Sequence, residues 1–256
     1  MVSESIKSGL HFATSAIGVV AATLSTHASA INVTLPTTNI QANAQYSFGS
    51  DTQDLMQSLG INVRALGNSV QSSPGVWSYS MPVTDVSLSM SLFPLSATPT
   101  AGHASGSALS IYCGKGELQL CNFALDFGRN VLMADLTTVA GTTKNFDVYN
   151  FNVAQGLKVS TSGGLSLDMS LVDMRLTSSA QSTFSRTLGL SRLVTSMLDQ
   201  VNFGQLDIHI TPALRFNVSD KAFVGSVVPE LASNGMFALG LVGLAIHTRR
   251  KVRENR

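Results

Sequence analysis

The segment Val86-Ser87-Leu88-Ser89-Met90-Ser91-Leu92 alternates an apolar side chain with a serine at every step. Successive side chains of a β-strand point to opposite faces, so this period of two places the apolar side chains on one face and the serines on the other. Leu165, Leu167, Met169 and Leu171 repeat the pattern later in the chain. The alternation predicts antiparallel strands with one face in a core and the other in water.

The second alternating segment changes phase after Leu171, because the next apolar residues are Val172, Met174 and Leu176. One extra residue in a strand produces such a shift, so we expect a β-bulge near Leu171. Other apolar segments, separated by Gly, Ser, Asn and Thr, are further strand candidates: 109–113, 118–127, 131–139, 146–152, 206–210 and 214–218. Many short strands predict a mainly β body over residues 31–224, built as an antiparallel sandwich or a barrel-like sheet.

Two stretches depart from this period. Helical spacing of the apolar residues from Phe184 to Val201 predicts one amphipathic helix, capped by Ser182 or Thr183 and ended by Gly204. The stretch 95–107 contains one proline and two glycines, and we expect a surface loop there.

The charge content argues against a nucleic-acid partner. Charged residues make up 12% of the 256 residues, against roughly 25% in an average soluble protein. Residues 31–228 contain 10 Lys and Arg against 12 Asp and Glu, a formal charge of −2. Phosphate backbones are bound by clustered Lys and Arg, which this body lacks.

The first thirty residues have the features of an export signal. Lys7 precedes an apolar run at 13–24, and Ala28 and Ala30 stand at the −3 and −1 positions of an Ala-x-Ala cleavage site. The run is shorter than the roughly 20 residues that span a bilayer. We therefore predict a signal peptide over 1–30, removed by signal peptidase to leave Ile31 first; an uncleaved anchor is the alternative.

The other end of the chain has three parts in a fixed order. Val228-Pro229-Glu230-Leu231 is followed by an apolar stretch from Met236 to Ile246, and a basic cluster with Arg249, Arg250 and Lys251 comes last. This order resembles the PEP-CTERM sorting signal, with a box at 228–231, a transmembrane segment at about 232–247 and a basic cluster at 249–253. Leu231 stands where that family usually has a second proline.

The resemblance implies an exosortase-like membrane enzyme that reads Val228, Pro229 and Glu230. The tail 228–256 would insert transiently in the inner membrane, with Arg249, Arg250 and Lys251 on the cytoplasmic side. The released protein would reach the cell surface or the extracellular space. The family also implies a link with exopolysaccharide and biofilms of Gram-negative bacteria. A plain anchor and a packed terminal helix are the alternatives from the residues alone.

The two cysteines flank a Gly-containing turn. Cys113 and Cys121 lie eight residues apart around Gly114-Lys115-Gly116-Glu117, and strand-like arms on both sides suggest a hairpin. Export to an oxidising compartment favours a disulfide between them, with two free thiols as the alternative. Two Cys without neighbouring His make a poor zinc set, so we expect no metal or cofactor.

Few residues of the body suggest chemistry. His209 should point to solvent from a strand, with Asp207 as a conceivable acid–base partner. Trp77 and Tyr79 would share one strand face as an aromatic platform for sugar, unless they belong to the core. We expect a non-catalytic exported protein. The alternatives are a secreted hydrolase that uses two carboxylates on polysaccharide, and a carbohydrate-binding adhesin.

Overall fold

The computed structural model describes residues 31–92, 95–160 and 165–227. The elements are β1 (Ile31–Pro36), β2 (Ile40–Ser47), α1 (Ser50–Ser58), β3 (Asn62–Gly67), β4 (Val70–Gln71), β5 (Ser78–Pro82), β6 (Asp85–Leu92), β7 (Leu95–Cys113), β8 (Gly116–Asp126), β9 (Val131–Thr138), β10 (Gly141–Ser160), β11 (Ser166–Leu176), α2 (Ser178–Thr187), α3 (Arg192–Thr195) and β12 (Gln205–Leu214). The predicted signal peptide and the predicted sorting tail lie outside the described residues.

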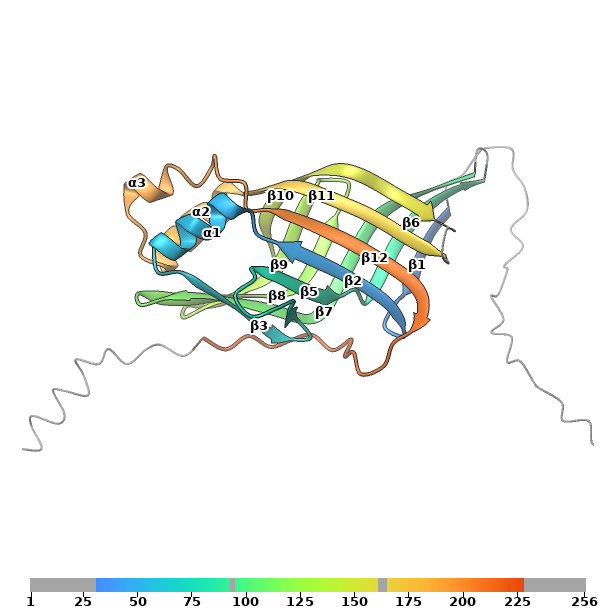
Figure 1. Ribbon diagram of the computed structural model, residues 1–256, viewed down its shortest axis with the longest axis horizontal. Helices are drawn as coiled ribbons and strands as arrows, with labels where there is room; N and C mark the ends of the chain where they lie inside the picture. Colours follow the sequence, from blue (N-terminus) through green and yellow to red (C-terminus); the bar gives the residue numbers. More distant parts are fainter. Residues whose placement is uncertain (1–30, 93–94, 161–164, 228–256) are drawn as a thin grey trace, which may run out of the picture.

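The strands form one continuous antiparallel sheet that curls into a half-barrel (Figure 1). Its order is β1-β6-β7-β8-β9-β10-β11-β12-β2-β5-β4, and β3 pairs with β7 beside this path. The mainly β prediction is therefore confirmed in its barrel-like form. The sandwich alternative is wrong, because strand pairing continues without a break where a sandwich would divide into two sheets.

The alternating segments form strands as predicted. Leu88 is buried in β6, and Met169 and Leu171 are buried in β11. Past the phase change, Met174 and Leu176 take over the buried positions. The predicted bulge lies at Asp173, whose φ is 54°, and the register of β11 against β10 shifts beside it. The bulge is thus what keeps both halves of β11 facing the core.

The expected loop at 95–107 is wrong, because these residues form the first part of the 19-residue strand β7. Pro99 lies opposite Leu88 beside a register shift, where a residue without an N–H donor is tolerated. Gly106, with φ of 75°, and Asn122 of β8, with φ of 53°, lie in an irregular stretch of the β7–β8 ladder. Residues with a left-handed backbone conformation fit inside bulges, so β7 continues through the proline and glycines that suggested a loop.

The single helix expected from 184 to 201 is also wrong. Two shorter helices, α2 and α3, take its place, and Gly189 between them has φ of 60°. The hydroxyl of Thr177 caps α2 by accepting a hydrogen bond from the Ala180 N–H. The expected strand at 214–218 is absent from the described residues, since β12 ends at Leu214.

The helices α1, α2 and α3 gather at one end of the half-barrel (Figure 1). Beneath them the aromatic rings of Phe48, Tyr46, Tyr149 and Phe203 pack edge-on or tilted, with centroids 4.7–6.0 Å apart. An apolar cavity inside the sheet has a volume of only about 40 Å³. Side chains therefore fill the half-barrel, leaving its outer surface and its ends for function.

Candidate functional site: the C-terminal strap

Residues Arg215–Val227, called here the strap, follow β12 and contain no helix or strand. They run along the outside of the sheet beneath β3 and β7 and reach β8 (Figure 1). A segment without ladder hydrogen bonds must find other partners for its backbone N–H and C=O groups. The strap finds them in side chains of the sheet.

Arg215 fixes the start of the strap. Its buried guanidinium donates all five of its N–H groups: to the carbonyl oxygens of Thr37, Thr38, Ala42 and Val83 and to Oδ1 of Asn43, at 2.5–3.3 Å. Burial lowers the pKa of Arg215 from its usual value. Complete donor pairing offsets the cost of burying the charge. The strap therefore leaves β12 from a position tied to the β1–β2 turn and to the junction of β5 with β6.

Asn122 holds the middle of the strap by binding both backbone groups of Phe223. Its Oδ1 accepts the Phe223 N–H at 2.7 Å, and its Nδ2 donates to the Phe223 carbonyl at 2.9 Å. The same amide accepts the Gly106 N–H and donates to Asp135. One side chain thus joins β7, β8, β9 and the strap.

Gln119 holds the end of the strap in the same manner. Its Oε1 accepts the Ser226 N–H, and its Nε2 donates to the Ser226 carbonyl, both at 3.0 Å. Gln119 pairs with Ser226 and Asn122 with Phe223, so residue numbers rise along β8 as they fall along the strap. The two amide side chains therefore take the role that a neighbouring antiparallel strand would play.

Asp135 on β9 binds Asn122 and so helps to orient the amide that holds the strap. It is buried, and it accepts hydrogen bonds from Lys144 Nζ at 2.6 Å, Asn122 Nδ2 at 2.8 Å and the Asn145 N–H at 3.2 Å. Burial alone would raise the pKa of Asp135, but the hydrogen bonds from Lys144, Asn122 and Asn145 outweigh it and lower the pKa. Asp135 is therefore a carboxylate at neutral pH and orients Asn122 toward the strap.

The strap lies close enough to the sheet to restrict which residues fit beneath it. A Cβ atom added to Gly106 would lie 2.9 Å from the Lys221 carbonyl oxygen and 2.6 Å from Nδ2 of Asn68. Asn68 itself donates to the Ser219 carbonyl at 2.7 Å. Gly106 is thus needed both for its left-handed φ and for the approach of the strap.

The strap ends beside the predicted processing box. Ser226, its last anchored residue, is two positions before Val228 in the sequence. The predicted sorting and cleavage residues all lie outside the described residues: Ala28, Ala30, Val228, Pro229, Glu230, Arg249, Arg250 and Lys251. In the described part of the chain, none of the helices has the length and apolarity that crossing a membrane requires.

The two histidines of the described residues, His103 and His209, lie on the outer face in two cross-strand pairs. Nδ1 of His209 is 2.5 Å from Oδ1 of Asp168, and Nδ1 of His103 is 2.6 Å from Oδ1 of Asp85. His209 is exposed, as predicted, and its carboxylate partner is Asp168, whereas Asp207 was the conceivable partner from the sequence. Asp207 instead accepts hydrogen bonds from Ser170 and Gln205.

In the described residues, neither histidine pair has a nucleophile on its second ring nitrogen, because Ser166 and Thr84 instead hydrogen-bond to the carboxylates of Asp168 and Asp85. A His–carboxylate pair acts as a catalytic base when the other ring nitrogen faces a hydroxyl, thiol or water. Within residues 31–92, 95–160 and 165–227, neither Nε2 atom has a hydrogen-bond partner from the protein. The hydrogen bond from His209 lowers the pKa of Asp168. The pairs connect neighbouring strands, β6 to β7 and β11 to β12.

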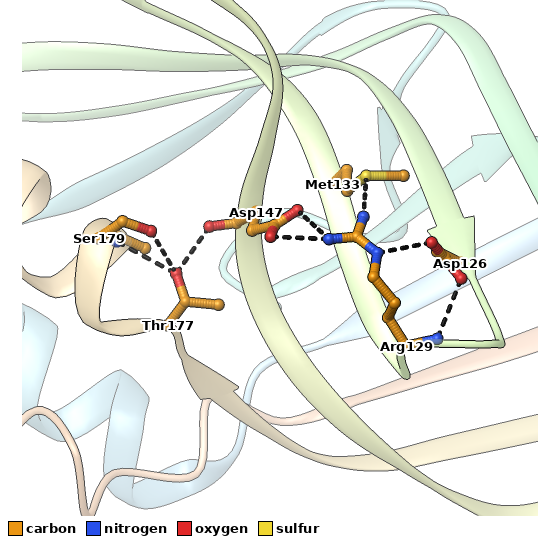
Figure 2. Close-up of polar contacts among 7 residues, drawn as sticks. Asp126, Arg129, Met133, Asp147, Thr177 and Ser179 are labelled. Carbon is orange, nitrogen blue, oxygen red and sulfur yellow. Dashed lines mark hydrogen bonds and ion pairs between the residues drawn. The ribbon is translucent and has the colours of Figure 1, made fainter.

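Arg129 lies between two carboxylates at the β8–β9 turn (Figure 2). Its Nε donates to Asp126 at 2.7 Å, its Nη1 donates to both oxygens of Asp147, and its Nη2 contacts Sδ of Met133. The hydrogen bond from Arg129 lowers the pKa of Asp126. The carbonyl of Asp147 also accepts a hydrogen bond from the Thr177 hydroxyl. This cluster ties the turn to β10 and to the start of α2.

The predicted disulfide between Cys113 and Cys121 is wrong. Both are free thiols, because the hairpin turns at Gly114-Lys115 and pairs Cys113 with Gly116 and Cys121 with Ala108. Cys113 packs against the core and contacts the Leu188 carbonyl, whereas Cys121 is fully buried elsewhere along the ladder. The tight turn therefore places the two thiols at different levels of the ladder.

Of the two alternatives for Trp77 and Tyr79, the structure supports core packing and not an aromatic platform for sugar. Tyr79 is 1% exposed and donates to the Val63 carbonyl, and Trp77 packs edge-on against Phe48 at 5.7 Å. Both rings belong to the core. Among the residues that the structure describes, no group of three or more His, Cys, Asp or Glu side chains has the geometry of a metal site.

The fold and the strap define a class of protein: an antiparallel half-barrel whose C-terminal segment is held outside the sheet by side-chain amides. No protein-family model matches the sequence, and no curated protein matches it either. Two solved structures from Corynebacterium glutamicum are similar. The C-terminal domain of HtaA has 16% identity and a TM-score of 0.45, over 68% of this chain and 97% of that one. The heme binding protein HtaB has 11% identity and a TM-score of 0.40, over 73% and 98%. Similarity at this level assigns no function.

Proposed function

We propose that this chain is an exported, non-catalytic protein of the cell surface or extracellular matrix, whose C-terminal tail is removed by an exosortase-like membrane enzyme. The observation that carries the proposal is the anchoring of the strap up to Ser226, two residues before the box Val228-Pro229-Glu230. An extended chain covers at most about 3.6 Å per residue. The box would begin within about 7 Å of a fixed point on the body.

The strap fixes the point at which the tail would leave the folded body. Such an arrangement suits a substrate that folds outside the membrane before the enzyme cuts it. The tail would hold the folded body at the outer face of the inner membrane, and the strap would hold the box at the edge of that body. At the other end, Ile31 lies in β1 and pairs with Met90. Removal of residues 1–30 would therefore leave a mature chain that enters the sheet from its first residue.

The carboxylates of the body favour the non-catalytic proposal over a hydrolase. A glycosidase needs one carboxylic acid whose pKa is raised, so that it can protonate the leaving group. The shifts at Asp126, Asp135 and Asp168 go the other way, because hydrogen bonds from Arg129, Lys144 and His209 favour the charged forms. These three acids serve as partners for cations and donors.

The test is an intact mass with C-terminal peptide mapping on exported protein from a host with its exosortase and from one without it. We expect a chain that begins at Ile31 and ends between Val228 and Leu231 only where the enzyme is present. A C-terminus at Arg256 in both hosts would make the tail a plain anchor and overturn the proposal. An N-terminus at Met1 on the exported protein would overturn the signal-peptide part.

A further inference from the structure

A cleft with both polar and apolar lining residues opens beside the end of the strap and has no role in the proposal above. It lies between the β7–β8 turn, the β9–β10 turn and α2, and Val227 forms part of its edge. Its volume is about 460 Å³, which falls within the roughly 300–1,000 Å³ of small-molecule sites in proteins. The cavity inside the sheet is less than a tenth of this size.

One wall of the cleft is a face of α2. Thr183, Arg186 and Thr187 line it together, since positions i, i+3 and i+4 of a helix share one side. In the described ranges the guanidinium of Arg186 makes no ion pair or hydrogen bond with the protein, and Arg186 is exposed. This wall therefore presents a planar cation and two hydroxyls to the solvent in the cleft.

The opposite wall carries an aromatic ring and a carboxylate. Tyr112 is 37% exposed, and the guanidinium of Arg64 lies 5.7 Å from the centroid of its ring. Among the described residues, the protein contacts of Glu117 all use Oε1, which binds Ser110 and Gln119 and lies 4.0 Å from Arg64. Oε2 of Glu117 is left as an acceptor. Lys115 uses one of its three donors on the Gly189 carbonyl.

The charge of the cleft is opposite to that of the body. Lys115 and Arg186 line it against the single carboxylate of Glu117, which lies 4.0 Å from Arg64 on the neighbouring strand β3, whereas residues 31–228 have a formal charge of −2. A local positive site on a negative body attracts anions selectively. The cleft also offers what sugar rings bind: an exposed aromatic ring, several hydroxyls and a free carboxylate oxygen.

We infer that this cleft binds an acidic saccharide, with the sugar carboxylate on Arg186 and Lys115, a ring against Tyr112, and sugar hydroxyls on Glu117 and the threonines. A carboxylate pairs with an arginine through two parallel hydrogen bonds, which gives the site direction as well as charge. This inference does not depend on removal of the tail, because every residue it uses belongs to the described body.

The test is calorimetric titration of the exported protein with tetragalacturonate, and with cellotetraose as a neutral tetrasaccharide. We expect saturable binding of tetragalacturonate that weakens as salt rises, and at least tenfold weaker binding of cellotetraose. Arg186→Gln should weaken tetragalacturonate binding by about tenfold or more, as the loss of one charge-assisted pair implies. Arg192→Gln, which removes an exposed arginine of α3 outside the cleft, should change it less than about twofold.

Tyr112→Ala separates a saccharide site from a general anion site, and inorganic tripolyphosphate serves as the anion without sugar rings. We expect the variant to weaken tetragalacturonate binding severalfold and to leave tripolyphosphate unchanged. Equal binding of the two tetrasaccharides would overturn the inference. Equal losses in Arg186→Gln and Arg192→Gln, or tripolyphosphate binding as tight as that of tetragalacturonate, would do the same. Intact-mass results on the tail bear on none of these outcomes, so the two proposals fail separately.

Discussion

Asn122 links the strap to the neighbouring strands β7 and β9. Four hydrogen bonds meet at its amide, and the side chain sits on a left-handed backbone position inside the β7–β8 ladder. A side chain that satisfies buried backbone groups is costly to remove, because its partners lose their bonds without regaining water. The strap therefore depends on a few side chains such as Asn122, whereas a paired strand is held along its whole length.

We predict that Asn122→Ala lowers the free energy of unfolding by about 2–4 kcal/mol. The measurement is urea unfolding at pH 7. Asn130→Ala is the matched control, because Asn130 has the same left-handed backbone, with φ of 54°, and an exposed side chain at the β8–β9 turn. Equal losses in the two variants would mean that backbone strain, and not the strap contacts, explains the effect.

The two thiols should differ sharply in reactivity. Burial raises the pKa of Cys121 to about 11, with the charge of Asp135 adding to the effect. Cys113 is only half-buried. The thiolate is the reactive form, so we predict that iodoacetamide at pH 8 labels Cys113 first and Cys121 only in denaturant. Peptide mapping of non-reduced protein gives the result, and a Cys113–Cys121 cross-link would contradict it.

At the scale of elements, the strands were easier to predict from the sequence than the structural effect of the prolines and glycines within them. The Val86–Leu92 alternation identified β6 because a period of two has one simple structural meaning. Pro99, Gly102 and Gly106 suggested a loop, but bulges and a neighbouring strand accommodate them inside β7. Gly189 divided the expected helix because its left-handed backbone ends one helix before the next begins.

The strap and the cleft could not be predicted from the sequence, because both depend on contacts between segments that lie far apart along the chain. Gln119 and Ser226 are 107 positions apart, and Arg215 reaches Thr37 over 178. Gln119, between Leu118 and Leu120, and Asn122, between Cys121 and Phe123, gave a local signal as polar residues in a mostly apolar run. The turn at Gly114-Lys115 likewise decided the fate of the disulfide, since only the register shows which residues face each other.

We predict that acid loosens the strap. The folded state lowers the pKa of Asp135 below the roughly 3.9 of an unfolded aspartate. Its contribution to stability is therefore complete above about pH 4 and is lost as the pH falls through the lower, folded value. The thermal midpoint should fall from pH 5 to pH 2.5, and Asp135→Asn should be less stable at pH 7 but lose less over this range.

Asp220→Asn is the control for the acid prediction, because Asp220 is an exposed carboxylate within the strap itself. Its pH profile should follow that of the unaltered protein. If Asp135→Asn and the unaltered protein lost the same stability between pH 5 and pH 2.5, the Asp135 network would not be what acid disrupts.

At the scale of the whole molecule, the processing enzyme could recognise the sequence of the box, or it could cut at a fixed distance from the folded body. If the enzyme reads Val228-Pro229-Glu230, ten Gly and Ser residues inserted between Val227 and Val228 should appear in full at the end of the mature chain. Intact mass of the exported protein measures this directly. A cut at the same distance from Ser226, inside the insertion, would mean that the enzyme measures position from the body.

The central claim is that the strap belongs to the folded body and fixes the exit of the tail. Hydrogen–deuterium exchange of the exported protein tests it at the amides of Phe223 and Ser226, which donate to Asn122 and Gln119. We predict that both amides exchange far more slowly than an unstructured chain, and that Phe223 loses this protection in Asn122→Ala. Exchange at the unstructured rate in the unaltered protein would contradict the claim, because the strap would then be a free linker and the exit unfixed.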